Sequence, residues 1–78
     1  MSLNPAADPT ELAKAFLTLP FAFLAPPEIS ELADQIKLGH YGRAYLRLQS
    51  DIETHEVCDN WIKADVERKV LMLLRGDR

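Results

Sequence analysis

The ten residues GHYGRAYLRL (residues 39–48) decide the fold that we expect for this 78-residue chain. Downstream of the glycine, apolar side chains recur every three or four residues, at Tyr41, Ala44, Tyr45, Leu48 and Ile52. This spacing places them on one face of an α-helix, which is predicted to begin near His40 or Tyr41. The opposite face carries Arg43, Arg47 and Asp51, and the last two are spaced to form an ion pair.

A tight turn is predicted just before this helix, because Gly39 can take the left-handed conformation that ends a preceding helix. Gly39, Tyr41 and Ala44 reproduce the pattern G-x-Y-x-x-A, which resembles the turn between the two helices of a tetratricopeptide repeat. The resemblance covers six residues and implies a close helical hairpin. A single repeat cannot bury its own face, so we expect the hairpin and not membership of that family.

Two shorter helices are expected upstream. The first runs from about Asp8 to Thr18, because Asp8 can cap it and Pro9 suits its first position. The second begins near Pro27 and ends at Gly39. Their apolar stripes are Leu12, Ala15, Phe16 and Leu19 in the first, and Ile29, Leu32, Ala33 and Ile36 in the second.

The segment LPFAFLAPPE (residues 19–28) connects these two helices and is apolar for most of its length. A secretory signal is not expected here, since the residues before the run include Asp8 and Glu11 and lack the required positive flank. Phe21, Phe23 and Leu24 are therefore predicted to fill the core of the bundle. A patch that faces a partner is the alternative.

The chain has no glycine or proline between residues 43 and 75, so one continuous helix is possible there. Polar residues interrupt the apolar stripe, which favours a break between Glu53 and Asp59, with Asp59 able to cap the next helix. A last helix ending at Gly76 is then expected to carry an apolar stripe of Val57, Trp61, Ile62, Val66, Val70, Leu73 and Leu74. Its final turns, VLMLL (residues 70–74), are apolar on every side, which indicates contact on every side.

Together these signals predict an all-α fold, a small three- to four-helix bundle with a tight hairpin at Gly39 and a long amphipathic C-terminal helix. Residues 1–7 are expected to form a flexible N-terminal arm and residues 8–76 a single helical domain. A chain of this length buries a modest core, and one cysteine cannot form an internal disulfide. Self-association is the remaining simple source of stability.

The residues His55, Cys58 and Asp59, with Asp51 one turn earlier, are of the types that ligate zinc. We expect no metal site from them, because a structural site needs more ligands from a second element. The alternative for His55 is a partly exposed ring beside a small buried thiol. Cys58 and His55 on one helix surface also lack the pocket and oxyanion donors of a thiol enzyme, so we expect no such activity.

The charge distribution argues against nucleic acid as the main partner. The net charge is −3, and residues 1–40 carry five acids against two bases. Binding to DNA needs a basic face that replaces counterions. A dimeric regulator that uses Arg43 and Arg47 in a helix-turn-helix arrangement is kept as the second hypothesis.

The leading hypothesis is a non-enzymatic protein-interaction module, such as an adaptor, an assembly factor or a small chaperone subunit. We expect a homodimer or a hetero-complex, a cytoplasmic location, no cofactor, no small-molecule substrate and no membrane span. No catalytic residue is assigned. The residues predicted to bind the partner are Trp61, Val66, Val70, Met72, Leu73 and Leu74, followed by Phe21, Phe23 and Leu24.

Overall fold

The computed structural model describes residues 8–75 and folds them into four helices with no strand in that range. The helices are α1 (Pro9–Leu17), α2 (Pro26–Lys37), α3 (Gly42–Val57) and α4 (Trp61–Arg75). The predicted all-α fold is confirmed. The expected arm at residues 1–7 and the expected helix end at Gly76 lie outside the described residues.

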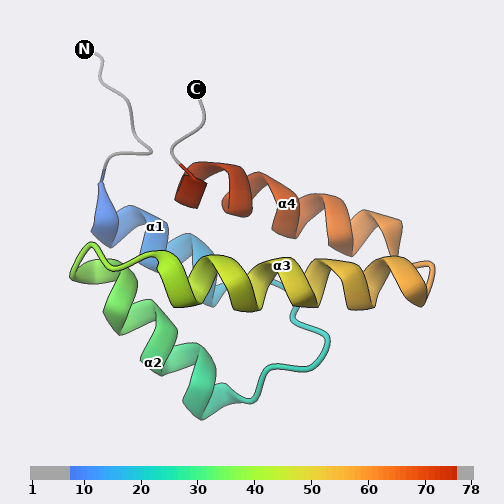
Figure 1. Ribbon diagram of the computed structural model, residues 1–78, viewed down its shortest axis with the longest axis horizontal. Coiled ribbons are helices and arrows are strands. Elements are labelled where there is room, and N and C mark those ends of the chain that lie inside the picture. The colour runs from blue at the N-terminus through green and yellow to red at the C-terminus, as the bar shows by residue number, and fades with distance from the viewer. Residues whose placement is uncertain (1–7, 76–78) are drawn as a thin grey trace.

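The helices form two pairs. The α1 helix packs chiefly against α2, and α3 packs chiefly against α4, with smaller contacts from α1 to α4 and from α2 to α3. Figure 1 shows α4 folded back along α3, while α2 runs away from α3 at an angle. The connector of residues 18–25 joins α1 to α2 and passes beside α3. None of the helices in residues 8–75 combines the length and apolar character needed to cross a bilayer.

The helix starts follow the local sequence. The Asp8 side chain caps α1 by accepting a hydrogen bond from the Thr10 N–H at 3.0 Å, and Pro9 takes the first helical position. Helix α2 begins at Pro26, one residue earlier than predicted, because two consecutive prolines are compatible with its first turn.

Two turns of the same kind end α2 and α3. After α2, Gly39 has a φ of +85°, and the His40 N–H donates to the Gln35 carbonyl at 2.9 Å. After α3, Asp59 has a φ of +62°, and the Asn60 N–H donates to the His55 carbonyl at 2.8 Å. Both are Schellman motifs, with the left-handed residue directly after the C-cap.

The second motif locates the break between α3 and α4. It lies after Val57, inside the predicted interval, but two details of the prediction were wrong. Val57 is the last residue of α3 and does not belong to the final helix. Asp59 does not cap α4, because its left-handed backbone ends α3. The residue directly before α4 is Asn60, whose carbonyl accepts from the Ala64 N–H at 3.0 Å.

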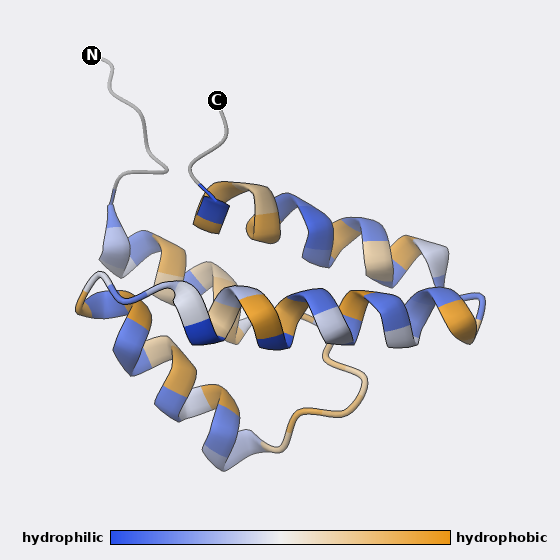
Figure 2. Cartoon of the chain, in the orientation of Figure 1, coloured by the Kyte–Doolittle hydropathy of each residue, from blue (hydrophilic) through white to orange (hydrophobic). Residues whose placement is uncertain are grey.

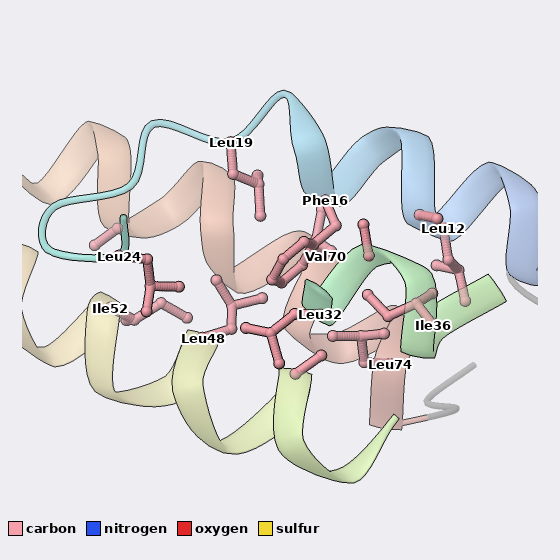
Figure 3. Close-up of a cluster of buried hydrophobic side chains, with 14 residues drawn as sticks. Leu12, Phe16, Leu19, Leu24, Leu32, Ile36, Leu48, Ile52, Val70 and Leu74 are labelled. Atoms are coloured by element: carbon pink, nitrogen blue, oxygen red, sulfur yellow. The ribbon is translucent and has the colours of Figure 1, made fainter. Parts of the chain in front are cut away.

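One hydrophobic core joins the two helix pairs (Figure 3). The largest apolar side chains in this core that are completely buried come from the first three helices. They are Phe16 of α1, Leu32 and Ile36 of α2, and Leu48 of α3. The connector contributes Leu19 and Leu24 to the same core, and α4 contributes Ala64, Val70 and Leu74.

Helix α4 is rotated relative to the sequence prediction. Val70 and Leu74 face inward, but Trp61, Ile62, Val66 and Leu73 do not join the core. The inward positions of the first half of α4 are occupied by Ala64 and Glu67. The prediction of one continuous apolar stripe along α4 was wrong, because the first half of the helix turns Ala64 and Glu67 inward and its larger apolar residues outward.

The two left-handed residues give a matched pair of stability predictions. Gly39→Ala meets no atom within 4 Å, so its effect is the backbone strain alone, and we expect a loss of about 1 kcal/mol in the free energy of unfolding. Asp59→Gly relieves the same strain, and we expect a gain of up to about 1 kcal/mol. Urea denaturation of both variants checks this, and effects of the same sign would contradict it.

Candidate functional site

Three ionisable side chains meet in the interior, and we call them the buried triad: Asp51, His55 and Glu67. Asp51 and His55 lie one turn apart on the inward face of α3, next to the core residues Leu48 and Ile52. Glu67 reaches them from α4. The exposed fractions of Asp51, His55 and Glu67 are 0%, 3% and 0%. Ionisable groups are buried to this extent only when other interactions compensate for the loss of water.

Asp51 compensates by binding the backbone of the connector. Its Oδ1 accepts hydrogen bonds from the N–H groups of Ala22 and Phe23, each at 3.0 Å, and its Oδ2 accepts from Ala22 at 3.0 Å. Hydrogen bonds to a carboxylate are about twice as strong as neutral ones. Asp51 thus fixes the connector on α3. The predicted pair of Arg47 with Asp51 was wrong: Arg47 Nε binds Glu28 Oε2 at 2.8 Å instead.

His55 binds the same connector at Pro20, two residues before Ala22. Its Nε2 lies 2.7 Å from the carbonyl oxygen of Pro20, and since a carbonyl oxygen can only accept, Nε2 carries the proton in this contact. Pro20 is held in a tight turn, in which the Phe21 N–H donates to the Leu19 carbonyl at 3.0 Å. The Nδ1 atom of His55 is buried without a hydrogen-bond partner.

Of the three side chains, Glu67 has the fewest interactions that could stabilise its ionised form. No protein group donates a hydrogen bond to either of its buried side-chain oxygens. Its Oε2 lies 3.5 Å from His55 Nε2. Burial raises the pKa of Glu67 to about 9, and a hydrogen bond to Asp51 and the negative charge of Asp51 add to the rise. At neutral pH the metal-free chain therefore keeps Glu67 protonated, which makes it a donor toward Asp51.

The buried triad also has the composition of a metal site. Each side chain offers one ligand atom, and the three atoms lie within 4.8 Å of one another. They are one imidazole nitrogen of His55 and one carboxylate oxygen each of Asp51 and Glu67. The sequence suggested four residues of the types that ligate zinc. Of these, His55 and Asp51 belong to the triad, whereas Cys58 and Asp59 are exposed. The expectation of a partly exposed histidine beside a buried thiol was therefore wrong on both counts.

Glu67 was not predicted from the sequence, although its position carried a signal. Glu67 lies three residues before Val70 and seven before Leu74, which is the spacing of the inward face of α4. Asp51 lies three residues after Leu48 and four before His55, which is also the spacing of one helix face on α3. An acid at a core position on each of two adjacent helices indicates a buried polar cluster.

The residues predicted to bind a partner are divided between core and surface. Leu24, Val70 and Leu74 belong to the core, and Phe21 packs partly against it, with its ring 5.0 Å from that of Phe16. Phe23 is 44% exposed, and the guanidinium carbon of Arg47 lies over its ring, 5.3 Å from the centroid of the Phe23 ring. The exposed members on α4 are Trp61, Val66, Met72 and Leu73, and Ile62, which was not among the predicted residues, is 82% exposed.

The two arginines of the DNA-binding hypothesis both have acidic neighbours on α2. Arg43 Nη1 lies 3.6 Å from Glu31 Oε2, and Arg47 is paired with Glu28. These acids offset the positive charge of the α3 surface, and a DNA phosphate would have to compete with them.

Comparison with known proteins gives no relative: no family model, no curated protein and no solved structure matches the chain.

Removal of the Asp51 carboxylate tests its role in the connector. Asp51→Ala leaves the Ala22 and Phe23 N–H groups without their acceptor, and we expect a loss of about 3 kcal/mol in the free energy of unfolding. The control Glu53→Ala removes an exposed acid from the same helix and is expected to change stability by less than about 0.5 kcal/mol. Urea denaturation measures both, and equal effects of the two variants would contradict the role of Asp51.

The raised pKa of Glu67 predicts the pH dependence of stability in the presence of a chelator. Unfolded Glu67 releases its proton near pH 4.5 and folded Glu67 near pH 9, so its contribution is complete below about 4.5 and is lost as the pH rises toward 9. The slope from this group is at most about 1.4 kcal/mol per pH unit.

Glu67→Gln mimics the protonated acid and should remove this slope, while Glu53→Gln should retain it. The measurement is the free energy of unfolding of the three chains at about pH 5 and about pH 8. Indistinguishable pH profiles for the unaltered chain and Glu67→Gln would show that Glu67 does not hold its proton in the folded state.

Proposed function

We propose that this chain is a non-enzymatic protein-interaction domain, an adaptor or assembly factor, which associates with a second copy of itself through the outer surface of α4. The observation that carries the proposal is an apolar row on that surface, formed by Ile62, Val66 and Leu73. Because these residues are spaced by four and seven, they lie along one side of the helix. We call them the α4 row.

The α4 row is open to solvent in the single chain. The exposed fractions of Ile62, Val66 and Leu73 are 82%, 42% and 36%. Trp61 and Met72 lie beside the row and are 58% and 47% exposed. Figure 2 shows apolar residues alternating with hydrophilic ones along α4. Contiguous apolar residues on the surface of a small domain are typical of a protein-binding face.

A second copy fits this surface because the row is self-complementary. If two α4 helices pack antiparallel about a twofold axis, Ile62 of each lies opposite Leu73 of the other, since the two residues are equally far from the centre of the row. The charged residues near the centre on the same side of the helix are Asp65 and Lys69, which pair within one chain at 3.8 Å. In the antiparallel arrangement each can reach the opposite charge on the other copy, as an isologous interface requires.

The other functions considered have less support from the described residues. The arginines available for DNA have acidic neighbours, and the exposed Cys58 and the buried His55 do not share one surface. A cytoplasmic location is part of the proposal, since a single exposed free thiol is compatible with a reducing compartment.

The proposal predicts the mass of the chain in solution. Light scattering should give twice the chain mass of 8.8 kDa as the concentration rises. Ile62→Glu places a charge on the α4 row at a residue that is outside the core, and it should shift the chain to the monomer without loss of helicity. Leu73→Glu should act in the same way.

The matched control is Leu46→Glu, which adds the same charge at an exposed leucine of α3, 62% accessible, away from the row. This variant should associate as the unaltered chain does. A monomer at concentrations of about 1 mM would contradict self-association, and a dimer that Leu46→Glu disrupts and Ile62→Glu does not would place the interface elsewhere.

A further inference from the structure

We propose that the buried triad of Asp51, His55 and Glu67 is a binding site for one divalent cation of the zinc class. This inference concerns the interior between α3, α4 and the connector, and it does not depend on the proposed interaction surface.

Two of the three distances between the ligand atoms fit a single small ion, and all three atoms lie within 4.8 Å of one another. His55 Nε2 lies 3.4 Å from Asp51 Oδ2 and 3.5 Å from Glu67 Oε2. Zinc binds nitrogen and carboxylate oxygen at about 2.0–2.1 Å, so two ligands of a tetrahedral ion are about 3.3–3.4 Å apart. Calcium needs six to eight oxygen ligands at longer distances, and the triad does not supply them.

The Glu67 carboxylate lacks a partner that would stabilise its negative charge, and a bound cation would provide one. No group of the described structure donates a hydrogen bond to either oxygen of the completely buried Glu67 side chain, so its ionised form has no partner. A divalent ion provides a ligand for this carboxylate, and its two positive charges balance those of ionised Asp51 and Glu67. The site with neutral His55 is then uncharged as a whole, which the apolar surroundings favour.

The structure also orients the first ligand before an ion arrives. The Ala22 and Phe23 N–H groups hold the Asp51 carboxylate in place at 3.0 Å, as partners outside the coordination sphere do in metal proteins. The Pro20 carbonyl oxygen, 2.7 Å from His55 Nε2, lies on the side where the ion would bind. Nε2 would bind the ion in place of the proton that it donates to this carbonyl, and the neutral ring would then carry its proton on Nδ1. The carbonyl could serve as a fourth ligand after moving from 2.7 Å to about 3.3 Å from Nε2.

The test uses Zn²⁺ with the full chain, in a background that removes other ligands. The chain has two histidines and one cysteine, and His40 and Cys58 are both exposed. In the double variant His40→Gln, Cys58→Ser, the only histidine left is His55. Calorimetry after treatment with a chelator should give one Zn²⁺ per chain with a Kd of about 1 μM or tighter, and the ¹⁵N resonances of the His55 ring should shift on binding.

Glu67→Gln in the same background should weaken Zn²⁺ binding at least about tenfold, and the matched Glu53→Gln should leave it unchanged. Circular dichroism verifies that both variants remain helical, and the His55 resonances test the site with the triad intact. The proposal is overturned if the double variant binds no Zn²⁺, if Zn²⁺ binds without moving the His55 resonances, or if a folded Glu67→Gln binds as tightly as its parent.

Discussion

The connector between α1 and α2 depends on the Asp51 carboxylate more than on any other polar group. The Ala22 and Phe23 N–H groups lie outside any helix, and Asp51 of α3 accepts from both. On either side of these residues, Leu19 and Leu24 enter the core. The carboxylate therefore fixes the α1–α2 connector on α3 and so ties the α1–α2 pair to the α3–α4 pair. If it were absent, the two leucines would have to be held by apolar contacts alone, without a fixed backbone between them.

Burial of this carboxylate has consequences for its neighbours. A second acid close to a buried negative charge cannot also ionise without a large energetic cost, so Glu67 either keeps a proton or shares a cation with Asp51. His55 lies between the two and reaches Pro20 at the start of the connector. The same three side chains thus determine how the connector is held and how α4 is placed against α3. The placement of α4 in turn leaves Ile62, Val66 and Leu73 facing outward.

Much of the backbone was predictable because local chemistry dictates it. The Asp8 cap, the prolines that open α1 and α2, and the left-handed Gly39 act within a few residues, and each was found at or within one position of its prediction. The break after α3 was less well defined, because Asp59 occupies a left-handed position that usually selects glycine. The sequence pattern therefore indicates the interval in which α3 ends, but not the residue at which it ends.

The orientation of the helices was harder to predict, and with it the candidate site. Pattern analysis assigns acids to solvent, so Asp51 was placed on the outer face of α3 and Glu67 was overlooked. Each is buried only because the other elements supply its partners, the connector amides for Asp51 and the triad for Glu67. These partners are distant in sequence, 28 and 29 residues for the amides, and no local rule connects them.

Hydrogen exchange of the Ala22 and Phe23 amides in the unaltered chain tests the central claim most directly. Both residues are exposed and lie outside the helices, so their amides would exchange rapidly if nothing bound them. If Asp51 holds the connector in place, both amides should be protected to nearly the same degree as the amide of Leu48 in the core of α3. Exchange at the rate of an unstructured loop, with Leu48 still protected, would contradict the account.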